Sequence, residues 1–356
     1  MSQFWSQRTH ELNPYTPGEQ PKDTQYIKLN TNENPYPPSE LVRRAITATS
    51  DDLLRLYPDP DAGELKTAIA DYYSVDKANV FVGNSSDEVL AHTFVALLKH
   101  NAPLLFPDIS YSFYPVYCSL FGIDSKMIPL NELFEIDIED YAVSSCGENG
   151  GIIFPNPNAP TGKVLSLDVI EQFLQEHPAS VVVIDEAYVD FGADTAISLT
   201  SKYNNLLVVQ TFSKSRSLAG LRVGFAVGNT DLIEGLERVK NSFHPFPLAR
   251  NAIAGAVASI QDKEGFENNR QKIMKTRART TLELENLGFD VIPSSTNFVF
   301  AKPPKEQSAE SLYLQLKQRN ILVRYFDAPR INEYLRISIG TDDEMDALIG
   351  ALHKLV

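Results

Sequence analysis

Two polar side chains stand at the ends of apolar runs, where an unpaired charge is costly. In "SVVVIDEAY", Asp185 follows directly on four aliphatic residues, and in "NLLVVQTFSK" Lys214 follows a similar run. A buried carboxylate needs a cationic partner. A lysine amine in a desolvated pocket loses its proton readily and can form a Schiff base with an aldehyde. Alone, Asp185 also fits a helix cap or a core ion pair, and Lys214 also fits a solvated loop lysine.

A candidate anion site lies in "GNSSDEVL" and "AGLRVGF". The first segment predicts a helix N-terminus that carries the hydroxyls of Ser85 and Ser86 beside free backbone N–H groups. Arg222 in the second segment can add a bidentate contact to a phosphate. Gly220 and Gly224 around it permit close approach of the backbone. Simple helix capping also explains the two serines, and both roles can hold together.

One planar cofactor would satisfy all these groups. Pyridoxal 5'-phosphate combines an aldehyde, a phosphate, a protonated ring nitrogen and a phenolic oxygen. Lys214 would hold the aldehyde, and Asp185 the ring nitrogen, so that the ring can act as an electron sink for a carbanion. The phenolic oxygen would contact Tyr188 and Asn158, and Tyr111 would stack on the ring unless its aromatic loop simply packs into the core. The residues expected around the phosphate are Ser86, Asp87, Ser213 and Arg222.

The elements that position these residues form an α/β pattern. From about residue 79, short apolar runs that end in turn residues alternate with longer helix-like stretches. The runs are continuously apolar, which is typical of a parallel sheet covered by helices on both faces. Ligands bind such sheets beyond the carboxyl ends of the strands, where the polar residues above collect. We therefore expect a large domain with a mostly parallel central sheet.

The pattern of predicted elements changes after about residue 250. A long charged helix that ends at Gly288 is followed by short strands and two further helices, the last with Thr341 and Glu344 in capping-box spacing. We predict an N-terminal arm over residues 1–28, a large cofactor-binding domain over 29–249 and a small α+β domain over 250–356.

Composition excludes several classes of protein. The 356 residues carry a formal net charge of -14, which argues against nucleic-acid binding and against attraction to anionic membranes. The start lacks a secretory signal pattern, and no apolar stretch approaches the roughly 18 residues that span a bilayer. The two cysteines form no CxxC pair, so no metal site is expected. A cytoplasmic protein is the expectation.

The chain resembles the fold-type I, aspartate-aminotransferase-like superfamily of pyridoxal-phosphate enzymes. Within it, the class II family of histidinol-phosphate aminotransferases is the most similar. An Asp-x-x-Tyr after a strand, a Ser-Lys about 28 residues on and an Arg eight residues beyond the lysine carry the likeness to the fold. The matching segments run in order from residue 29 to 341: "LNTNENPYPPS", "RLYPDPDAGELKTAIA", "VFVGNSSDEVL", "NPNAPTGKV", "VVVIDEAYVDF", "TFSKSRSLAGLRVGFAVG", "STNFVF" and "YLRISIG".

The resemblance implies an activity and further site residues. It implies transamination of L-histidinol phosphate with 2-oxoglutarate, which gives imidazole acetol phosphate and glutamate in histidine biosynthesis. Tyr57 would reach the cofactor phosphate of the neighbouring subunit, so the active unit would be a homodimer. Arg336 would bind the anionic group of the substrate, and Arg324 would help to hold the phosphate of histidinol phosphate, although an edge-strand arginine facing water is the alternative for Arg324.

Two positions depart from the family pattern. The family usually has an asparagine before Pro-Thr-Gly that contacts the phenolic oxygen of the cofactor, and this chain has Ala159 there, with Asn158 as the candidate substitute. Near the start, Asn34 stands where some relatives have a tyrosine. Tyr36 is the candidate that serves in its place, and both Asn34 and Tyr36 are expected in the substrate-binding pocket.

Other functions share most of these residues. An aromatic amino-acid aminotransferase would differ only in the substrate pocket, and a phosphothreonine decarboxylase of the same fold would also need a phosphate pocket. A non-catalytic cofactor-binding regulator is a more distant alternative, because no DNA-binding domain is apparent. A nicotinamide dehydrogenase is disfavoured because no GxGxxG follows a predicted strand.

Overall fold

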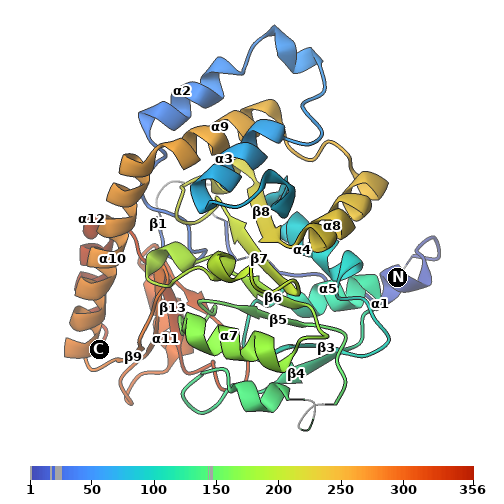
Figure 1. Ribbon diagram of the computed structural model, residues 1–356. Helices are drawn as coiled ribbons and strands as arrows, with labels where there is room; N and C mark the ends of the chain where they lie inside the picture. Colours follow the sequence, from blue (N-terminus) through green and yellow to red (C-terminus); the bar gives the residue numbers. More distant parts are fainter. Residues whose placement is uncertain (1, 17, 21–25, 143, 145–146) are drawn as a thin grey trace.

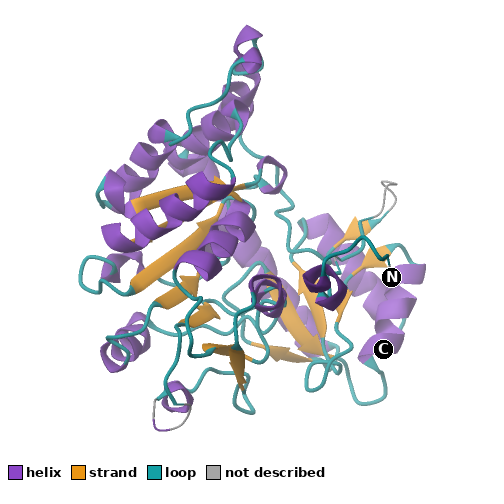
Figure 2. Cartoon of the chain, turned by 90° about the vertical axis from the view of Figure 1, so that its right-hand side faces the viewer, coloured by secondary structure: helices purple, strands orange, loops and turns teal. Residues whose placement is uncertain are grey.

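The computed structural model describes residues 2–16, 18–20, 26–142, 144 and 147–356. Part of the expected N-terminal arm, residues 1, 17 and 21–25, therefore lies outside the described residues. Figure 1 shows the chain wound around a central sheet, and Figure 2 shows this sheet and its helices on one side of the molecule, with a smaller sheet on the other. Two sheets of this kind are what the sequence predicts.

Within the described ranges the central sheet has seven strands in the order β2-β8-β7-β6-β5-β3-β4. β8 runs antiparallel to its neighbours β2 and β7, and the other neighbours pair in parallel. The expected mostly parallel sheet is confirmed. The bounds are β2 (Val80–Asn84), β3 (Leu104–Pro107), β4 (Ser125–Ile128), β5 (Ile152–Pro155), β6 (Val182–Asp185), β7 (Leu206–Thr211) and β8 (Val223–Gly228).

Helices cover both faces of this sheet. Apolar side chains of α3, α7 and α9 pack on one face, and those of α4, α5 and α8 pack on the other. Successive strand residues point to opposite faces, so Val182 and Ile184 join the first core and Val183 the second, each fully buried. Burial on both faces explains the continuously apolar strands. The helices are α2 (Glu40–Ala48), α3 (Gly63–Tyr73), α4 (Ser85–Ala96), α5 (Tyr114–Phe121), α7 (Leu167–Glu176), α8 (Thr230–Phe243) and α9 (Arg250–Gln261).

The small domain is an antiparallel sheet in the order β12-β13-β10-β9, covered by helices. The long helix α10 runs along one side of the molecule beside this sheet (Figure 1). Thr341 and Glu344 form the predicted capping box at the start of α12. The elements are α10 (Lys263–Asn286), β9 (Asp290–Ile292), β10 (Phe298–Lys302), α11 (Ala309–Gln318), β11 (Ile321–Leu322), β12 (Arg324–Tyr325), β13 (Leu335–Ser338) and α12 (Asp342–Leu352).

Two segments near the predicted domain boundaries differ from the prediction in the domain that they pack against. β1 (Ile27–Lys28) pairs in parallel with β11, and Leu29 packs in the small-domain core, so this start of the chain belongs with the small domain. Helix α9 instead packs under the large sheet, through Ala252, Ala256 and Ile260 among others. Because α9 packs on the large sheet, the large domain extends about a dozen residues beyond the boundary expected between residues 249 and 250.

Residues from Gln7 to Tyr15 of the N-terminal arm lie against the large domain of their own chain, whereas Glu19 pairs with Lys317 of the small domain. Helix α1 (Gln7–Glu11) is held near α5 because Nε of Arg8 donates to the Leu120 carbonyl at 3.4 Å. The ring centroid of Tyr15 lies 5.1 Å from that of Phe113. Short 3-10 turns complete the fold at Asp52–Arg55, Lys77–Asn79, Ile138–Tyr141, Val189–Phe191, Ala196–Leu199 and Ala219–Leu221.

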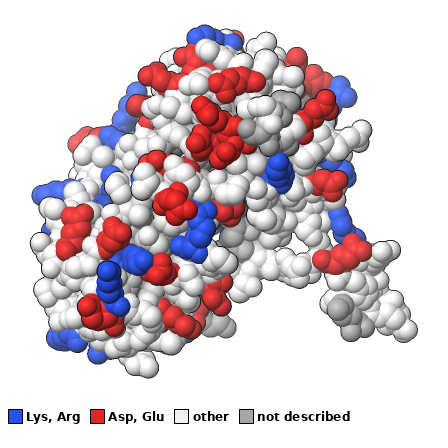
Figure 3. Space-filling model, turned by 90° about the horizontal axis from the view of Figure 1, so that it is seen from below, with Lys and Arg blue, Asp and Glu red and all other residues white. Residues whose placement is uncertain are grey.

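Acidic and basic side chains are interspersed on the face shown in Figure 3. Of the helices in the described ranges, none has the length and apolar character to cross a membrane. The described residues also contain no group of three or more His, Cys, Asp and Glu side chains that could hold a metal ion.

Candidate active site

The polar residues that follow the strands meet at one edge of the central sheet, as the parallel order requires. Asp185 is the last residue of β6, Ser213 and Lys214 follow β7, and Ser86 and Asp87 lie in the first turn of α4. They line a cavity of about 380 Å³ together with Tyr111, Ala159, Tyr188 and Arg222. A neighbouring cavity of about 670 Å³ shares Lys214, Tyr188, Tyr111 and Ala159 with the first.

Lys214 is half-buried at the junction of these two cavities. Its Nζ donates to the Thr31 carbonyl at 3.3 Å and lies 5.7 Å from the ring centroid of Tyr188. Asn34 fixes the backbone around the lysine, because its Nδ2 donates to the carbonyls of Lys214 and Ser215 at 3.0 and 3.1 Å. The amide of Asn34 thus holds the loop that carries Lys214, and the substrate-binding role expected for this residue stays a prediction.

Asp185 is buried among neutral partners. The Tyr114 hydroxyl donates to its Oδ2 at 3.0 Å, and the Ala187 N–H donates to its Oδ1 at 3.2 Å. Burial raises the pKa of the Asp185 carboxyl to about 6, although both hydrogen bonds act in the opposite direction. Asp185 forms no ion pair with the described residues, and a protonated ring nitrogen in the cavity would supply a cationic partner, so the residue fits the expected cofactor.

The expected phosphate site forms where α4 begins. Gly224 in β8 passes so close to this turn that a Cβ atom there would lie 2.3 Å from the Ser86 nitrogen. A Cβ at Gly220, which lines the cavity, would meet nothing within 4 Å among the described residues, so the close approach expected at this glycine stays a prediction. The Ser213 hydroxyl lies 3.0 Å from Oγ1 of Thr211. Hydroxyls, helix N–H groups and Arg222 together suit a phosphate.

Asp87 organises this site through its carboxylate. Nη2 of Arg222 donates to Oδ2 of Asp87 at 2.6 Å, and the Tyr111 hydroxyl donates to Oδ1 at 2.9 Å. The negative side chain therefore orients the arginine and the tyrosine, while a phosphate would be repelled by it. Burial and the Asp87 charge raise the pKa of the Tyr111 hydroxyl far above its ordinary value, so this phenol stays protonated.

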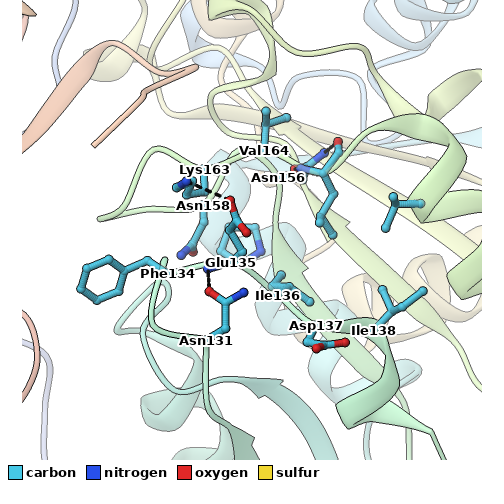
Figure 4. Close-up of a pocket in the computed structure, with 13 residues that line it drawn as sticks. Asn131, Phe134, Glu135, Ile136, Asp137, Ile138, Asn156, Asn158, Lys163 and Val164 are labelled. Carbon is cyan, nitrogen blue, oxygen red and sulfur yellow. Dashed lines mark hydrogen bonds and ion pairs between the residues drawn. The ribbon is translucent and has the colours of Figure 1, made fainter. Parts of the chain in front are cut away.

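Asn158 does not line either of these cavities. Its Nδ2 donates to the Ile109 carbonyl at 2.9 Å and to Oγ1 of Thr161 at 3.0 Å. The residue instead borders a separate cavity of about 310 Å³, near the ion pair of Lys163 with Glu135 (Figure 4). The side chain of its neighbour Ala159 borders the site, and this residue offers no hydrogen-bond donor there except its backbone.

Two arginines lie next to each other on the wall of the larger cavity. Arg324 in β12 and Arg336 in β13 are paired in register on neighbouring strands, and both line the cavity. Arg336 stacks on Phe298 and Phe326, each 5.4 Å from ring centroid to guanidinium carbon. Its Nη2 donates to the Asn30 carbonyl at 3.0 Å, while the buried Nε has no hydrogen-bond partner among the described residues.

The electrostatics of this arginine pair favour an anionic ligand. Burial lowers the pKa of the Arg336 guanidinium, and the nearby positive charge of Arg324 lowers it further. A buried cation without a carboxylate partner gains the most from an anion that enters the cavity. The predicted roles of both arginines in holding anionic groups therefore fit the structure.

Two predicted residues lie away from the cavities of this chain. Tyr36 packs against the small-domain core, with Nζ of Lys272 over its ring at 5.0 Å, and lines neither cavity. Tyr57 is 79% exposed and stacks on Phe246 at 4.7 Å. The exposed position of Tyr57 is what a residue that serves another subunit requires.

Sequence reasoning missed several residues that line the larger cavity. Tyr15 of the arm, Asn30 and Asn32 lie there with Phe326 and Arg330. Arg330 donates to Oδ2 of Asp108 at 3.1 Å, a contact across 222 residues that no local pattern reveals. The crowding of amides in "LNTNENPY" is the one signal in the sequence that points to Asn30 and Asn32.

Comparison with known proteins agrees with this geometry. The family model for aminotransferase class I and II matches residues 24–352 of the chain. Histidinol-phosphate aminotransferase 1 of Hydrogenovibrio crunogenus is 58% identical over 356 residues, which cover 100% of this chain and 99% of that protein. Histidinol-phosphate aminotransferase of Aromatoleum aromaticum is 57% identical over 100% of both chains.

A solved structure is similar over most of its length. Histidinol-phosphate aminotransferase from Sinorhizobium meliloti, in complex with pyridoxal-5'-phosphate, has a TM-score of 0.84 at 25% identity and covers 92% of this chain and 91% of that one. L-threonine-O-3-phosphate decarboxylase from Porphyromonas gingivalis has a TM-score of 0.78 at 24% identity, over 92% and 98% of the chains, and shares the fold.

Proposed function

The chain belongs to the aminotransferase class I and II family, and from this premise we propose that it transfers the amino group of L-histidinol phosphate to 2-oxoglutarate with pyridoxal 5'-phosphate as cofactor. The products are imidazole acetol phosphate and glutamate. Relatives named for this activity that are 58% identical over the whole chain support the substrate. The observation that carries the proposal in the structure is the neighbouring pair Arg324 and Arg336 in the cavity that Lys214 lines.

The cofactor fits the residues present at the strand ends. Ser86, Ser213 and Arg222 would hold its phosphate, Asp185 its ring nitrogen and Tyr188 its phenolic oxygen. When bound, pyridoxal phosphate supplies an electron sink for negative charge that develops at the substrate Cα. Tyr111 covers this cavity with a phenol that stays protonated and is anchored to Asp87.

The residues of the chain perform the proton transfers and the binding. Lys214 would remove the Cα proton of the substrate as general base and, once protonated, would serve as the general acid. The Thr31 carbonyl holds its amine at the junction of the two cavities. Arg336 would bind an anionic group of each substrate, and Arg324 would help to hold the phosphate of histidinol phosphate. Their stacking on Phe298 and Phe326 orients the guanidinium planes.

The alternative activities differ in the anionic groups that the pocket must hold. Phenylalanine carries a carboxylate and no phosphate, so the second arginine would have no partner. O-phospho-L-threonine carries both groups and would lose carbon dioxide in place of its amine. The pair of arginines thus favours a phosphorylated substrate over an aromatic amino acid.

A half-reaction tests the substrate. The purified protein with bound cofactor is mixed separately with histidinol phosphate, phenylalanine and O-phospho-L-threonine, and absorbance reports conversion of the cofactor to its amine form. Conversion by histidinol phosphate at the lowest concentration is expected. A response to phenylalanine alone would contradict the substrate and leave the family assignment in place.

The variant Arg324→Gln tests the phosphate site. It should raise the KM for histidinol phosphate by about tenfold, since one charge-assisted hydrogen bond is worth roughly 1.5 kcal/mol or more. The KM for glutamate in the reverse reaction should change less. Equal effects on both KM values would argue against contact between Arg324 and the substrate phosphate.

The proposal includes a homodimer in the cytoplasm. Leu53, Leu54, Leu56 and Tyr57 form an exposed apolar stretch, each between 44% and 79% accessible, which a second copy of the chain would cover. Tyr57 would then contact the cofactor phosphate of that copy. The buried thiol of Cys118 is free, as is usual in a reducing compartment.

A further inference from the structure

The phenolic oxygen of the cofactor lacks one of its expected contacts in this chain. Ala159 has no side-chain donor, and the Nδ2 of Asn158 is bonded to the Ile109 carbonyl and to Thr161, in a different cavity. Tyr188 is left as the side chain that the strand end offers to this oxygen. A residue that fixes Tyr188 would therefore matter more here than in relatives that have the asparagine.

Asn32 contacts Tyr188 directly. Its Nδ2 donates to the Tyr188 hydroxyl oxygen at 2.9 Å, and the residue is 1% exposed. Its backbone has φ of +55°, a left-handed conformation that asparagine adopts more readily than most residues. The contact spans 156 residues in sequence and joins the N-terminal segment to the loop after β6.

A buried network fixes the direction of this amide. The backbone N–H of Asn32 donates to Oγ of Ser338 at 2.8 Å, so that hydroxyl keeps its hydrogen for Oδ1 of Asn32 at 3.0 Å. Nδ2 of Asn297 donates to the Asn32 carbonyl at 2.9 Å. With Oδ1 accepting from Ser338, the NH₂ group faces Tyr188.

The direction of the Asn32 amide determines whether the Tyr188 hydroxyl donates or accepts a hydrogen bond in the cavity. Its oxygen accepts a hydrogen bond from Asn32, so its hydrogen is available to an acceptor in the cavity. Hydrogen bonds in a chain polarise one another, and donation from Asn32 makes the phenol a stronger donor. The deprotonated phenolic oxygen of the cofactor is the acceptor that this hydrogen would stabilise.

We propose that Asn32 is a positioning residue that compensates for the missing asparagine at Ala159, because it orients and strengthens Tyr188 as the donor to the phenolic oxygen of the cofactor. This inference rests on the proposed function, since it needs pyridoxal phosphate in the cavity. Asn32 acts through Tyr188, whereas the asparagine of the family would contact the cofactor itself.

The test is a pH titration of the absorbance of protein reconstituted with pyridoxal 5'-phosphate. Asn32→Gly removes the amide and keeps the left-handed backbone with its contacts to Ser338 and Asn297. With a weaker donor, the deprotonated form of the bound cofactor is less stable, so the midpoint should rise by about one pH unit, the equivalent of one hydrogen bond. An unchanged midpoint in a variant that binds the cofactor fully would overturn the proposal.

Two further variants separate this role from a structural one. Ala159→Asn in the Asn32→Gly background restores a donor in the cavity and should bring the midpoint back towards the wild-type value. In a Tyr188→Phe background, Asn32→Gly should cause no additional shift, because its effect passes through the phenol. Failure of the rescue together with an additive shift would count against the proposal.

Two controls keep the outcomes distinct. If Asn32→Gly does not fold, as judged by thermal unfolding, Asn32→Asp replaces it, because a carboxylate of the same shape accepts the Tyr188 hydrogen and should raise the midpoint too. An unchanged midpoint in that variant would equally overturn the role of Asn32. A wild-type protein that shows no cofactor absorbance would instead contradict the proposed function.

Discussion

Lys214 and Asp185 line one cavity, but their own hydrogen bonds lead to different parts of the chain. The lysine amine donates to the Thr31 carbonyl in the N-terminal segment, and the carboxylate accepts from Tyr114 in α5. Each group is held in place by a partner that is neutral. Both are therefore available to opposite ends of a bound cofactor, which explains how two single residues can define its orientation.

Lys214→Ala should abolish covalent attachment of the cofactor. Reduction of the wild-type protein with borohydride in the presence of pyridoxal phosphate should add one phosphopyridoxyl group to the chain, because the imine, formed with loss of water, is reduced to a stable secondary amine at Nζ. The variant should stay unlabelled and folded when intact mass and thermal unfolding are measured. The control Lys202→Ala removes an exposed lysine paired with Glu171 and should be labelled like the wild type. Labelling of Lys214→Ala at full yield would place the attachment elsewhere.

The raised pKa of Asp185 predicts a pH dependence of the stability of the cofactor-free protein. Burial raises the pKa of this carboxyl to about 6, above its value of about 3.9 in the unfolded chain. The folded protein thus binds the proton more tightly, and stability falls as pH rises from about 4 to about 6. Asp185→Asn should raise the free energy of unfolding at pH 8 by on the order of 2 kcal/mol and change it little at pH 4.

Chemical denaturation of the cofactor-free variant and wild type at both pH values measures this difference. Glu186 also has its pKa raised by burial, to about 7, and contributes equally to both proteins. With pyridoxal phosphate added, the wild type should become more stable than the variant, because the cofactor stabilises the wild type more. A variant less stable than wild type at pH 8 without cofactor would refute the expected cost of burying this charge.

At the scale of elements, the contact between β8 and the start of α4 sets the shape of the phosphate site. Gly224→Ala would place a Cβ about 2.3 Å from the Ser86 nitrogen and 2.4 Å from the Ser85 carbonyl carbon, so the first turn of α4 must move. We expect the Kd for pyridoxal phosphate to rise at least tenfold, roughly the loss of one charge-assisted hydrogen bond. Fluorescence or absorbance titration of the cofactor measures this change.

The matched control is Gly350→Ala in α12. A Cβ at this glycine meets nothing within 4 Å, and it lies in the small domain far along the chain. This variant should bind the cofactor like the wild type and should be slightly more stable, since alanine favours a helix. Equal cofactor affinity for Gly224→Ala and the wild type would show that the turn adapts without loss.

The sequence predicted the elements whose signals are local. Continuous apolar runs indicated β5, β6 and β7, and the position of Asp185 and Lys214 at their ends followed from the order of a parallel sheet. Strand β4 escaped prediction because Ser125, Lys126 and Met127 are exposed at the sheet edge and leave no apolar run. The antiparallel direction of β8 depends on the short turn after Lys214, which carries no periodic signal.

The sequence did not predict the direction of site side chains whose hydrogen-bond partners lie far away in the chain. The direction of Asn158 is set by the Ile109 carbonyl, 49 residues earlier, and Asn32 is fixed by Ser338, 306 residues away. The position of Tyr36 under the small domain is likewise decided by packing on α10. Residue type and spacing can indicate that an amide lies near a site, but tertiary contacts decide where it points.

At the scale of the whole molecule, charge is distributed unevenly between surface and cavity. The chain carries a net charge of -14, while the substrate cavity is lined by Arg324, Arg330 and Arg336. Anionic substrates must therefore approach against the overall charge and gain their binding energy inside. Cations on the wall of a cavity contact an anion in a medium less polar than open water, which makes each contact stronger than on the outer surface.

The exposed Tyr57 predicts that each active site is built from two chains. Tyr57→Ala should weaken binding of pyridoxal phosphate by about tenfold, the loss of one hydrogen bond to a phosphate. In this chain the residue is 79% exposed and stacks on Phe246, and its carbonyl accepts from Arg250 at 2.9 Å. Those contacts hold the phenol outward, away from its own cavity, so we expect its effect on the cofactor in a partner subunit.

Hybrid dimers test this arrangement directly. Lys214→Ala and Tyr57→Ala chains are unfolded, mixed in equal amounts and refolded at a cofactor concentration that saturates only the wild type. Half of the dimers formed at random are hybrids, and each has one site with both changes and one intact site, so about a quarter of the wild-type activity should return. Each variant refolded alone sets the background. If Tyr57 instead served its own chain, every site in the mixture would carry one of the changes, and the activity would stay at the mean of the two variants.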